Sequence, residues 1–274
     1  MKYLIWRHEN ALGNSAEQTV GLAKHLQKNN IKNATVFVEN EFQAHFAACI
    51  PGVSKIEMLP KDGDYTTLES LLKYIPQDMH IPSVYWNDKM PFNKYPGSWA
   101  ELVGPPHKPL EFPFHSYGNQ HKFPNNTIVL QFRERGTHWK RVDGAESEPN
   151  RFVNPKTFFE LAIYYANRGH TVVRIGDKNQ IPMPKHDNII DFAKYENRNM
   201  LDDLFLIATS KVFLSSDSGV WPMAGGMGKN LVLSNVAQAF YTDWLPKETT
   251  TVLFKKDGND NSFEELITAV DKYL

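Results

Sequence analysis

The stretch of sequence that decides the fold is Lys211-Val212-Phe213-Leu214-Ser215-Ser216-Asp217-Ser218-Gly219. Its apolar first half has the length and composition of a buried β-strand, and its small polar second half is typical of a turn that precedes a helix. Ligands of parallel sheets bind beyond the carboxyl ends of the strands, where backbone amides and a helix N-terminus favour a phosphate. The turn therefore predicts an anion site formed by Ser215, Ser216, Ser218 and Gly219, in which Asp217 holds amides or a ligand hydroxyl. N-capping of the next helix by serine and aspartate is the alternative interpretation.

Strands and helices alternate along the rest of the chain. Apolar runs of strand length precede segments with helical periodicity, first over residues 1–60 and again over residues 127–235. Such alternation is typical of parallel α/β sheets. The expected elements are strands over 3–6, 34–38, 56–59, 127–132, 171–175, 189–192, 211–214 and 230–234, and helices from the N-cap Ser15, over 41–50, 155–167 and 200–210, around Gly225 to Gly228, and over 263–274.

A stretch from about residue 85 to residue 124 separates the two α/β units. It is rich in proline, aromatic residues and histidine, and it has neither a strand nor a helix period. We therefore predict two Rossmann-like lobes. The first comprises residues 1–120, including most of the irregular interlobe segment, and the second comprises residues 121–274.

The bulk composition excludes several classes of protein. Of the 274 residues, 41% are hydrophobic and 22% are charged, as in a folded globular protein. The net charge of −1 supplies no broad phosphate-binding face, so a nucleic-acid partner is not expected. No segment approaches the roughly 20 apolar residues of a membrane span. The single cysteine, Cys49, is expected to be a buried thiol in a reducing, cytoplasmic compartment, with any membrane association being peripheral to the inner face.

Two arginines follow the expected strand at residues 127–132. Arg133 and Arg135 lie two residues apart in a loop, a spacing that suits two-pronged hydrogen bonding to a diphosphate. Either one is a candidate for stabilising charge on a departing diphosphate. Surface ion pairs with Glu134 or Glu146 are the alternative interpretation.

The next expected strand also ends in candidate ligand-binding residues. Arg174, Gly176 and Asp177 occur together at its end, where glycine permits a close approach and Asp177 offers acceptors to ribose hydroxyls or a base edge. Asp191, at the end of the following short strand, is a second candidate for pairing with a base. A plain strand-ending turn is the alternative interpretation.

The polar turn after the first expected strand supplies candidates for acid–base chemistry. His8 and Glu9 are the natural candidates for a general base acting on a hydroxyl. Asn10, Gly13 and Asn14 complete the turn on the side of the first lobe. The alternative is a turn whose side chains are merely solvated.

One short pattern suggests a metal, but weakly. Asp62-Gly63-Asp64 matches an Asp-x-Asp arrangement that holds a cation, yet Lys61-Asp62-Gly63-Asp64 also has the composition of a simple turn. The ten histidines show no zinc-binding spacing. The sequence therefore predicts neither a metal nor another resident cofactor.

These motifs resemble those of bacterial glycosyltransferases. Gly13-Asn14 resembles the Gly-Leu-Gly-Asn turn of fucosyltransferases and the Gly-Asp turn of heptosyltransferases, and residues 131–135 resemble the His-x-Arg-Arg segment of fucosyltransferases. Residues 201–208 with the 215–219 turn are similar to the C-terminal donor motif of both groups. Residues 168–177 with 188–191 resemble an uncharacterised bacterial glycosyltransferase family of the same fold.

The resemblance implies the GT-B fold, with an acceptor-side N-terminal lobe, a C-terminal lobe that binds a nucleotide sugar, and usually no metal. Three positions depart from the family patterns: Gln131 replaces a histidine, Glu134 replaces a second arginine, and Asn14 replaces a base-like aspartate. The nucleotide, which is GDP, UDP or ADP, and the catalytic base therefore stay open.

The expected activity is transfer of a sugar from a nucleotide sugar, as co-substrate, to a hydroxyl of a glycan or another acceptor. A single displacement of this kind inverts the anomeric centre. The candidate catalytic residues are Glu9, His8 and Arg133. Two alternatives stay open: a nucleotide-sugar-binding protein without turnover, and a pyruvyl transferase or sugar epimerase on the same fold.

Overall fold

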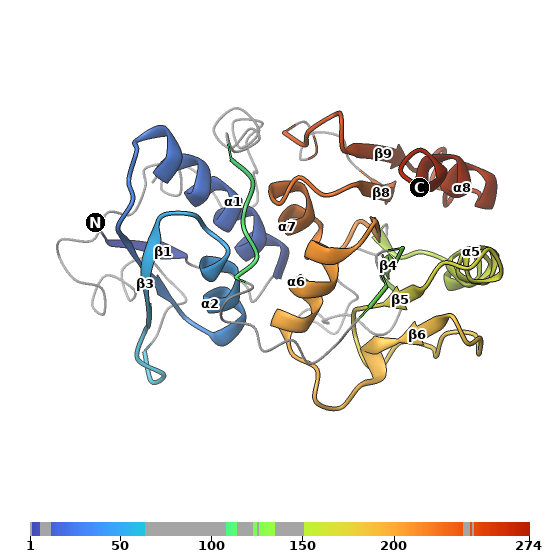
Figure 1. The fold of residues 1–274 in the computed structure, drawn as a ribbon, viewed down its shortest axis with the longest axis horizontal. Coiled ribbons are helices and arrows are strands. Elements are labelled where there is room, and N and C mark those ends of the chain that lie inside the picture. Colours follow the sequence, from blue (N-terminus) through green and yellow to red (C-terminus); the bar gives the residue numbers. More distant parts are fainter. Residues whose placement is uncertain are drawn as a thin grey trace.

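The computed structural model describes residues 2–5, 12–63, 108–113, 123–124, 126–134, 151–237, 242 and 244–274. The chain forms two bodies side by side (Figure 1), each built on its own parallel sheet. The predicted α/β fold with two Rossmann-like units is confirmed. The boundary proposed near residue 120 falls in a region that the structure describes only in short pieces.

The first body contains a sheet of three strands in the order β1-β2-β3, all parallel. Its described elements are β1 (Lys2–Ile5), α1 (Leu12–Lys28), β2 (Ala34–Val38), α2 (Glu41–Ala48) and β3 (Val53–Met58). Asn40 caps α2 because its side chain accepts a hydrogen bond from the Gln43 N–H. The expected strand–helix–strand–helix–strand order of this half is therefore present.

The second body contains a parallel sheet of six strands in the order β6-β5-β4-β7-β8-β9. This is the doubly wound order, in which the chain reverses direction across the sheet between β4 and β7. Ligands of such sheets bind outside the carboxyl ends of the strands at this switch point. The strands are β4 (Ile128–Gln131), β5 (Val172–Arg174), β6 (Ile189–Asp191), β7 (Val212–Ser216), β8 (Leu231–Val236) and β9 (Thr250–Phe254).

Helices cover both faces of the second sheet (Figure 1). One face packs against α5 (Pro155–Asn167) and α8 (Phe263–Asp271), and the other packs against α6 (Met200–Thr209) and α7 (Trp221–Gly226). Local sequence sets the helix ends: α6 and α8 begin with capping boxes, at Asn199 and Ser262. The left-handed Gly169 follows α5, as its sequence predicted.

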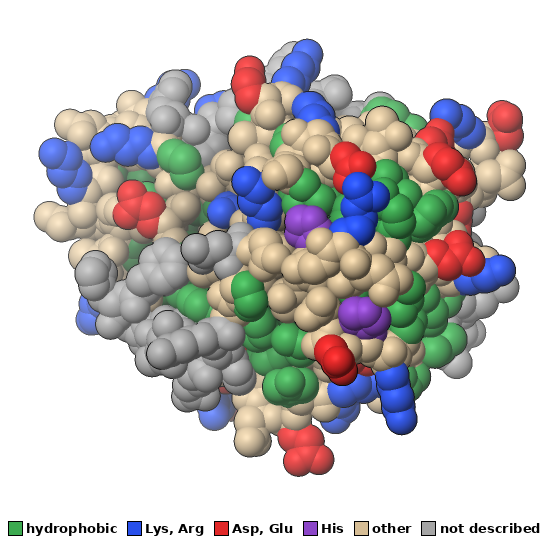
Figure 2. Space-filling view, turned by 45° about the vertical axis from the view of Figure 1, so that its right-hand side comes forward, with side chains coloured by type: hydrophobic (Ala, Val, Ile, Leu, Met, Phe, Trp, Pro, Cys, Tyr) green, Lys and Arg blue, Asp and Glu red, His purple; other side chains and the backbone are tan. Residues whose placement is uncertain are grey.

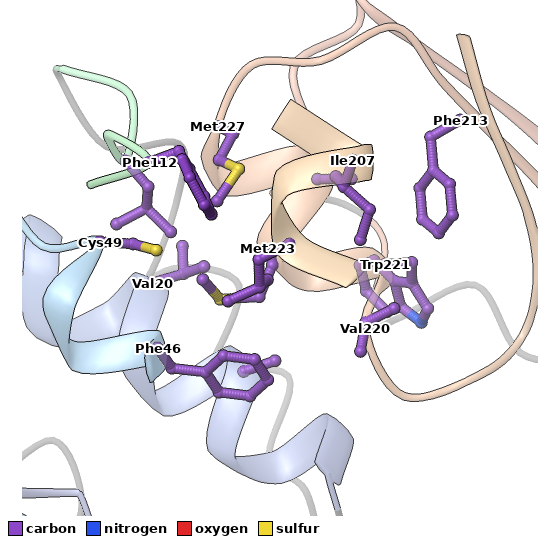
Figure 3. Close-up of a cluster of buried hydrophobic side chains, with 14 of the residues drawn as sticks. Val20, Phe46, Cys49, Phe112, Ile207, Phe213, Val220, Trp221, Met223 and Met227 are labelled. Carbon is purple, nitrogen blue, oxygen red and sulfur yellow. The ribbon is translucent and has the colours of Figure 1, made fainter. Parts of the chain in front are cut away.

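A single hydrophobic cluster joins the two bodies. Figure 3 shows side chains of the first body, such as Val20 and Phe46, pointing toward Met223 and Trp221 of the second. These side chains are almost completely buried. Because the cluster is shared, neither body can move away from the other without exposing apolar surface to water.

The segment 108–113 lies along this junction, beside α1 (Figure 1). The Leu110 N–H donates to the carbonyl of Gly226 in α7, and the Glu111 N–H donates to the carbonyl of Cys49 at the end of α2. The Leu110 and Phe112 side chains are part of the shared cluster. This part of the predicted irregular segment therefore bonds to both bodies.

Three sequence predictions about the elements are wrong in detail. Helix α1 begins at Leu12, so Ser15 is not its N-cap; the Ser15 hydroxyl is buried inside the helix and accepts a hydrogen bond from Gln43. Strand β7 extends through Ser216, so the first two serines of the expected turn belong to the sheet. Strand β9 was not predicted, although its threonines and apolar residues favour a strand.

The face of the molecule shown in Figure 2 carries no dominant charge. On the face shown in Figure 2, acidic and basic side chains are interspersed, in keeping with the net charge of −1. Among the described helices, none is long and apolar enough to cross a bilayer.

A substitution at Gly226 tests the packing at the junction between the two bodies. A methyl group there would lie 2.8 Å from Val20 Cγ2 and 2.8 Å from Leu110 Cδ1, so Gly226→Ala overpacks the shared cluster. We expect it to lower the free energy of unfolding by about 1–3 kcal/mol, partly offset by about 1 kcal/mol of helix propensity. Thermal and denaturant melting measure the change.

Gly13→Ala is the matched control, because a methyl group at Gly13 would stay 3.5 Å from its nearest neighbours, which is ordinary contact. It gains the same helix propensity without overpacking. If the melting temperature of Gly226→Ala equals or exceeds that of Gly13→Ala, the described packing of α7 on α1 is wrong.

Candidate functional site

The site predicted from the sequence lies at the switch point of the six-stranded sheet. Strands β4 and β7 are neighbours there, and Gln131 at the end of β4 pairs in register with Ser215. The Ser216 hydroxyl accepts a hydrogen bond from the Arg133 backbone N–H at 3.0 Å. This bond fixes the loop that follows β4 against the end of β7. The structure therefore brings the predicted Arg133 and Ser216 segments together.

Asp217 is held by an arginine that the sequence did not single out. Its carboxylate Oδ1 lies 3.0 Å from Arg151 Nη2, and the Arg151 Nε donates to the Asp217 carbonyl at 3.0 Å. Asp217 is fully buried. The N-cap of α7 is Val220, without a side-chain capping bond, so the capping interpretation of the 215–219 turn is wrong.

The turn after β7 differs in exposure along its length. Ser215, Ser216 and Asp217 are fully buried, whereas Ser218 and Gly219 are only partly buried. The Ser218 hydroxyl oxygen is buried and has no hydrogen-bond partner in the part of the chain that the structure describes. The last two residues are therefore those through which this turn can meet a ligand directly.

Arg133 is buried rather than part of a surface ion pair. Only 5% of the residue is exposed, and its guanidinium lies 5.5 Å from the centre of the Phe152 ring. Its carbonyl accepts a hydrogen bond from the Val153 N–H at 3.0 Å. The surface interpretation of Arg133 is therefore wrong. Arg135 lies outside the described residues.

Arg174 and Asp191 pair with each other. The Arg174 Nε and Nη2 each donate to one oxygen of the Asp191 carboxylate at 2.8 Å, and its Nη1 donates to the Ile181 carbonyl at 2.8 Å. Arg174 is fully buried. This fork joins β5 to β6, so both residues have a structural role whatever their predicted part in ligand binding.

Glu134 faces the same arginine from the loop after β4. Its Oε1 lies 3.9 Å from Arg174 Nη1, and its Oε2 accepts a hydrogen bond from the Ile181 N–H at 2.9 Å. Burial raises the pKa of Glu134, although the Ile181 N–H, Arg174 and Lys194 oppose the rise. Glu134 thus contributes to the structural cluster around Arg174 and is not a surface partner of Arg133.

The turn after β5 combines strain and exposure. Gly176 has a φ of +128°, a conformation that favours glycine. Asp177 is exposed, and its side chain accepts a hydrogen bond from the Asn179 N–H at 2.7 Å, which closes the turn. Gln180 is buried and donates to the Phe132 carbonyl, tying this turn to the loop after β4.

The N-terminal lobe meets this site through the start of α1. A methyl group on Gly13 would lie 3.5 Å from the Gly219 Cα atom, so the backbones of the two lobes approach closely there. Asn14 belongs to the first turn of α1 rather than to the preceding loop. His8, Glu9 and Asn10, the other predicted residues of this region, lie outside the described residues.

Two other predictions concern metal and thiol chemistry. Asp62 is exposed in the turn after β3, and Asp64 lies outside the described residues. Within the described ranges no group of three or more His, Cys, Asp or Glu side chains is arranged to hold a metal ion. Cys49 is fully buried, as expected, and burial raises the pKa of its thiol to about 12.

Sequence reasoning missed three residues that contribute to this region, which are Arg151, Gln180 and Glu17. Arg151 contacts Asp217 across 66 residues of chain, and Gln180 contacts Phe132 across 48. No local spacing signals such pairs. Glu17 had a usable signal, since it lies four residues after Gly13 and therefore on the same helix face.

Comparisons with known proteins identify the fold. No family model and no curated protein matches the sequence. Solved structures do match. A glycosyl transferase family 9 protein from Veillonella parvula DSM 2008 has a TM-score of 0.58 and 12% identity, covering 99% of this chain and 96% of that one.

The E. coli heptosyltransferase WaaC with ADP has a TM-score of 0.56 and 8% identity over 100% of both chains. The same enzyme with ADP-2-deoxy-2-fluoro heptose has a TM-score of 0.51 and 9% identity, again over 100% of both chains. At these identities the likeness concerns the fold. The chain has the GT-B fold, two Rossmann-like lobes arranged as in these glycosyltransferases.

The fork between Arg174 and Asp191 gives a stability prediction. Arg174→Ala removes the arginine that pairs with the buried Glu134 and the partly buried Asp191, so we expect the free energy of unfolding to fall by about 3–5 kcal/mol. Arg174→Lys should recover only part, because a lysine cannot form the fork. Denaturant unfolding measures both variants.

The matched control is Lys156→Ala, which removes an exposed ion pair to Glu160 with a nitrogen–oxygen distance of 3.8 Å. Exposed pairs contribute about 0–1 kcal/mol. If Lys156→Ala and Arg174→Ala lowered the free energy of unfolding by the same amount, a structural role for the buried fork would be contradicted.

Proposed function

We propose that this chain is a glycosyltransferase that moves a sugar from a nucleotide-sugar donor to a hydroxyl of an acceptor. The observation that supports it best is the arrangement at the switch point, where the Arg133 N–H donates to the Ser216 hydroxyl, directly before the turn at 217–219. A doubly wound sheet binds nucleotides at this place. The GT-B fold adds support, because the similar solved structures include a heptosyltransferase with ADP.

We propose that the donor diphosphate lies between the loop after β4 and the turn after β7. Arg133 and Arg135 supply cations there, and the backbone of Ser218 and Gly219 supplies hydrogen-bond donors. The unpartnered Ser218 hydroxyl is a further donor for a phosphate oxygen. Ser215, Ser216 and Asp217 are fully buried, so we propose that they hold this turn in position rather than contact the donor.

The proposed reaction is a single displacement. An acceptor hydroxyl oxygen attacks the anomeric carbon as the bond to the diphosphate breaks, and this inverts the anomeric centre. Charge develops on the departing diphosphate, so arginines aimed at it stabilise the transition state more than the ground state. A group of the N-terminal lobe accepts the hydroxyl proton, and His8 and Glu9 are the candidates from the sequence.

The other candidate donor-binding residues, Asp177, Arg174 and Asp191, follow strands β5 and β6 or lie at their ends. Asp177 is exposed beyond β5, where its second carboxylate oxygen can accept from a ribose or base. Arg174 and Asp191 are proposed to act through the shape of the β5–β6 edge, since each already pairs with the other. We place the reaction in the cytoplasm, where a free thiol such as Cys49 stays reduced.

A panel of ADP-, GDP- and UDP-sugars tests the function. A donor at about 100 times its dissociation constant should add roughly 2.7 kcal/mol of stability in thermal-shift experiments. Turnover with mixed glycan acceptors should follow and should persist with EDTA, since we propose a metal-independent enzyme. Binding without turnover would favour a binding protein, and conversion without acceptor would favour an epimerase. No binding at all would contradict the proposal, and a pyruvyl transferase would remain.

The arginines give the sharpest mutational prediction. A hydrogen bond to a charged group contributes about 1.5–3 kcal/mol, so Arg133→Ala or Arg135→Ala should weaken donor affinity roughly 10- to 150-fold. Turnover should fall as well, because the leaving diphosphate gains charge. Calorimetry with ADP, GDP and UDP, together with turnover assays, measures both effects.

Arginine-to-lysine variants control for charge alone and should recover affinity only in part. Melting confirms that each variant folds. If both alanine variants fold, bind and turn over donor as the parent does, the diphosphate lies elsewhere.

A further inference from the structure

Glu17 lies on the face of α1 that meets the second lobe. It follows Gly13 by four residues, so both occupy one side of the helix. The backbone of Gly13 approaches that of Gly219 so closely that a methyl group on Gly13 would lie 3.5 Å from the Gly219 Cα atom, at the end of the turn where we place the diphosphate. Glu17 is partly buried, one helical turn further along this junction. Its position places a carboxyl group of the N-terminal lobe beside the proposed donor pocket.

The charged groups that act on Glu17 come from the opposite lobe. They are the Arg151 guanidinium and the Asp217 carboxylate, which also pair with each other at 3.0 Å. On α1 itself, the residues one turn away are uncharged: Gly13, Asn14, Val20 and Gly21. Because Arg151 is already bonded to Asp217, it only partly compensates a negative charge on Glu17.

This environment changes how Glu17 holds its proton. Burial raises the pKa of Glu17 to about 7; Arg151 opposes the rise and Asp217 adds to it. A carboxyl group with a pKa near the working pH is ionised often enough to accept a proton and basic enough to keep it. An ordinary exposed glutamate, with a pKa near 4.3, is a far weaker base.

We propose that Glu17 is the general base of the transfer reaction, an inference that rests on the proposed glycosyltransferase function. Position and chemistry both support this choice. Asn14, one turn earlier on α1, has an amide side chain that cannot accept a proton in this way. Glu17 supplies a carboxyl group from the same helix, four residues after Gly13 and therefore on the helix side that approaches Gly219.

The proton and the electrons balance in this step. The acceptor hydroxyl proton moves to a Glu17 carboxylate oxygen as the hydroxyl oxygen forms its bond to the anomeric carbon. The bond between that carbon and the diphosphate oxygen breaks, and its electron pair leaves with the diphosphate. Glu17 then releases the proton to water after the product departs.

The test compares Glu17→Gln with the parent enzyme, using the nucleotide sugar selected by the panel. Loss of a general base costs typically 10²- to 10⁴-fold in rate, so turnover should fall by that range, while donor affinity by calorimetry changes less than about threefold. The parent rate should rise with pH through about 7 as Glu17 ionises. This rise, the acidic limb of the pH–rate profile, should be absent in Glu17→Gln.

Glu160→Gln is the matched control, since Glu160 is an exposed glutamate on α5 in a surface ion pair. It should keep the parent rate and pH profile. Glu17→Asp, which keeps a carboxylate, should recover part of the rate and retain an acidic limb. A carboxyl group with a raised folded-state pKa destabilises the fold above that pKa. Glu17→Gln should therefore melt no lower than the parent at pH 8.

The outcomes separate this inference from the proposed function. If the parent turns over a nucleotide sugar but Glu17→Gln keeps its rate and acidic limb, Glu17 is not the base. Loss of the limb in Glu9→Gln or His8→Ala, but not in Glu17→Gln, also overturns it. If Glu17→Gln fails to fold, a Glu17→Asp variant that folds and keeps the full parent rate would overturn it, because a carboxylate moved back by one methylene cannot serve the same hydroxyl equally well. No turnover by the parent would instead contradict the proposed function.

Discussion

The packing of α1 against α7 is the contact on which the rest of the structure depends. Apolar side chains from both lobes share one buried cluster, in addition to a second cluster beneath α5 and α8 in the C-terminal lobe, and Gly226 lets α7, α1 and segment 108–113 approach closely. Removing this apolar surface from water holds the lobes together. It also fixes the start of α1 against the turn at 217–219. The geometry of the candidate site is therefore a consequence of hydrophobic packing some residues away.

Buried ion pairs then decide which charges remain for a ligand. Arg174 is enclosed by Asp191 and Glu134, and Arg151 is bonded to Asp217, so both arginines have carboxylate partners within the protein. Such pairs hold loops in place because separating them leaves a buried charge. We therefore propose the arginines that follow β4, rather than Arg151 or Arg174, as the cations that meet the diphosphate. This explains why an arginine count in the sequence overstates the number of candidate ligand-binding groups.

Local signals made much of the fold predictable, and distant contacts account for what was missed. Helix α5 has the predicted bounds because Asn154, Pro155 and Gly169 mark its ends within the sequence itself. The hydrogen bond from the Arg133 N–H to the Ser216 hydroxyl was not predicted, because the two residues are 83 positions apart. Arg151 was overlooked for the same reason. Strand ends indicated where to look for a site, and the register of β4 against β7 then showed that Gln131 lies beside Ser215.

The departures from the family motifs become intelligible in three dimensions. Glu134 is at the position where the fucosyltransferase motif has a second arginine. Here its carboxylate accepts a hydrogen bond from the Ile181 N–H and lies near the Arg174 guanidinium. An arginine at this position would put a second buried cation beside Arg174. Similarly, Asn14 replaces a carboxylate, yet a helix rises only about 4.5 Å over three residues. Glu17 is three residues further along the same helix, so we propose that its carboxyl group takes the role that an aspartate at position 14 would have.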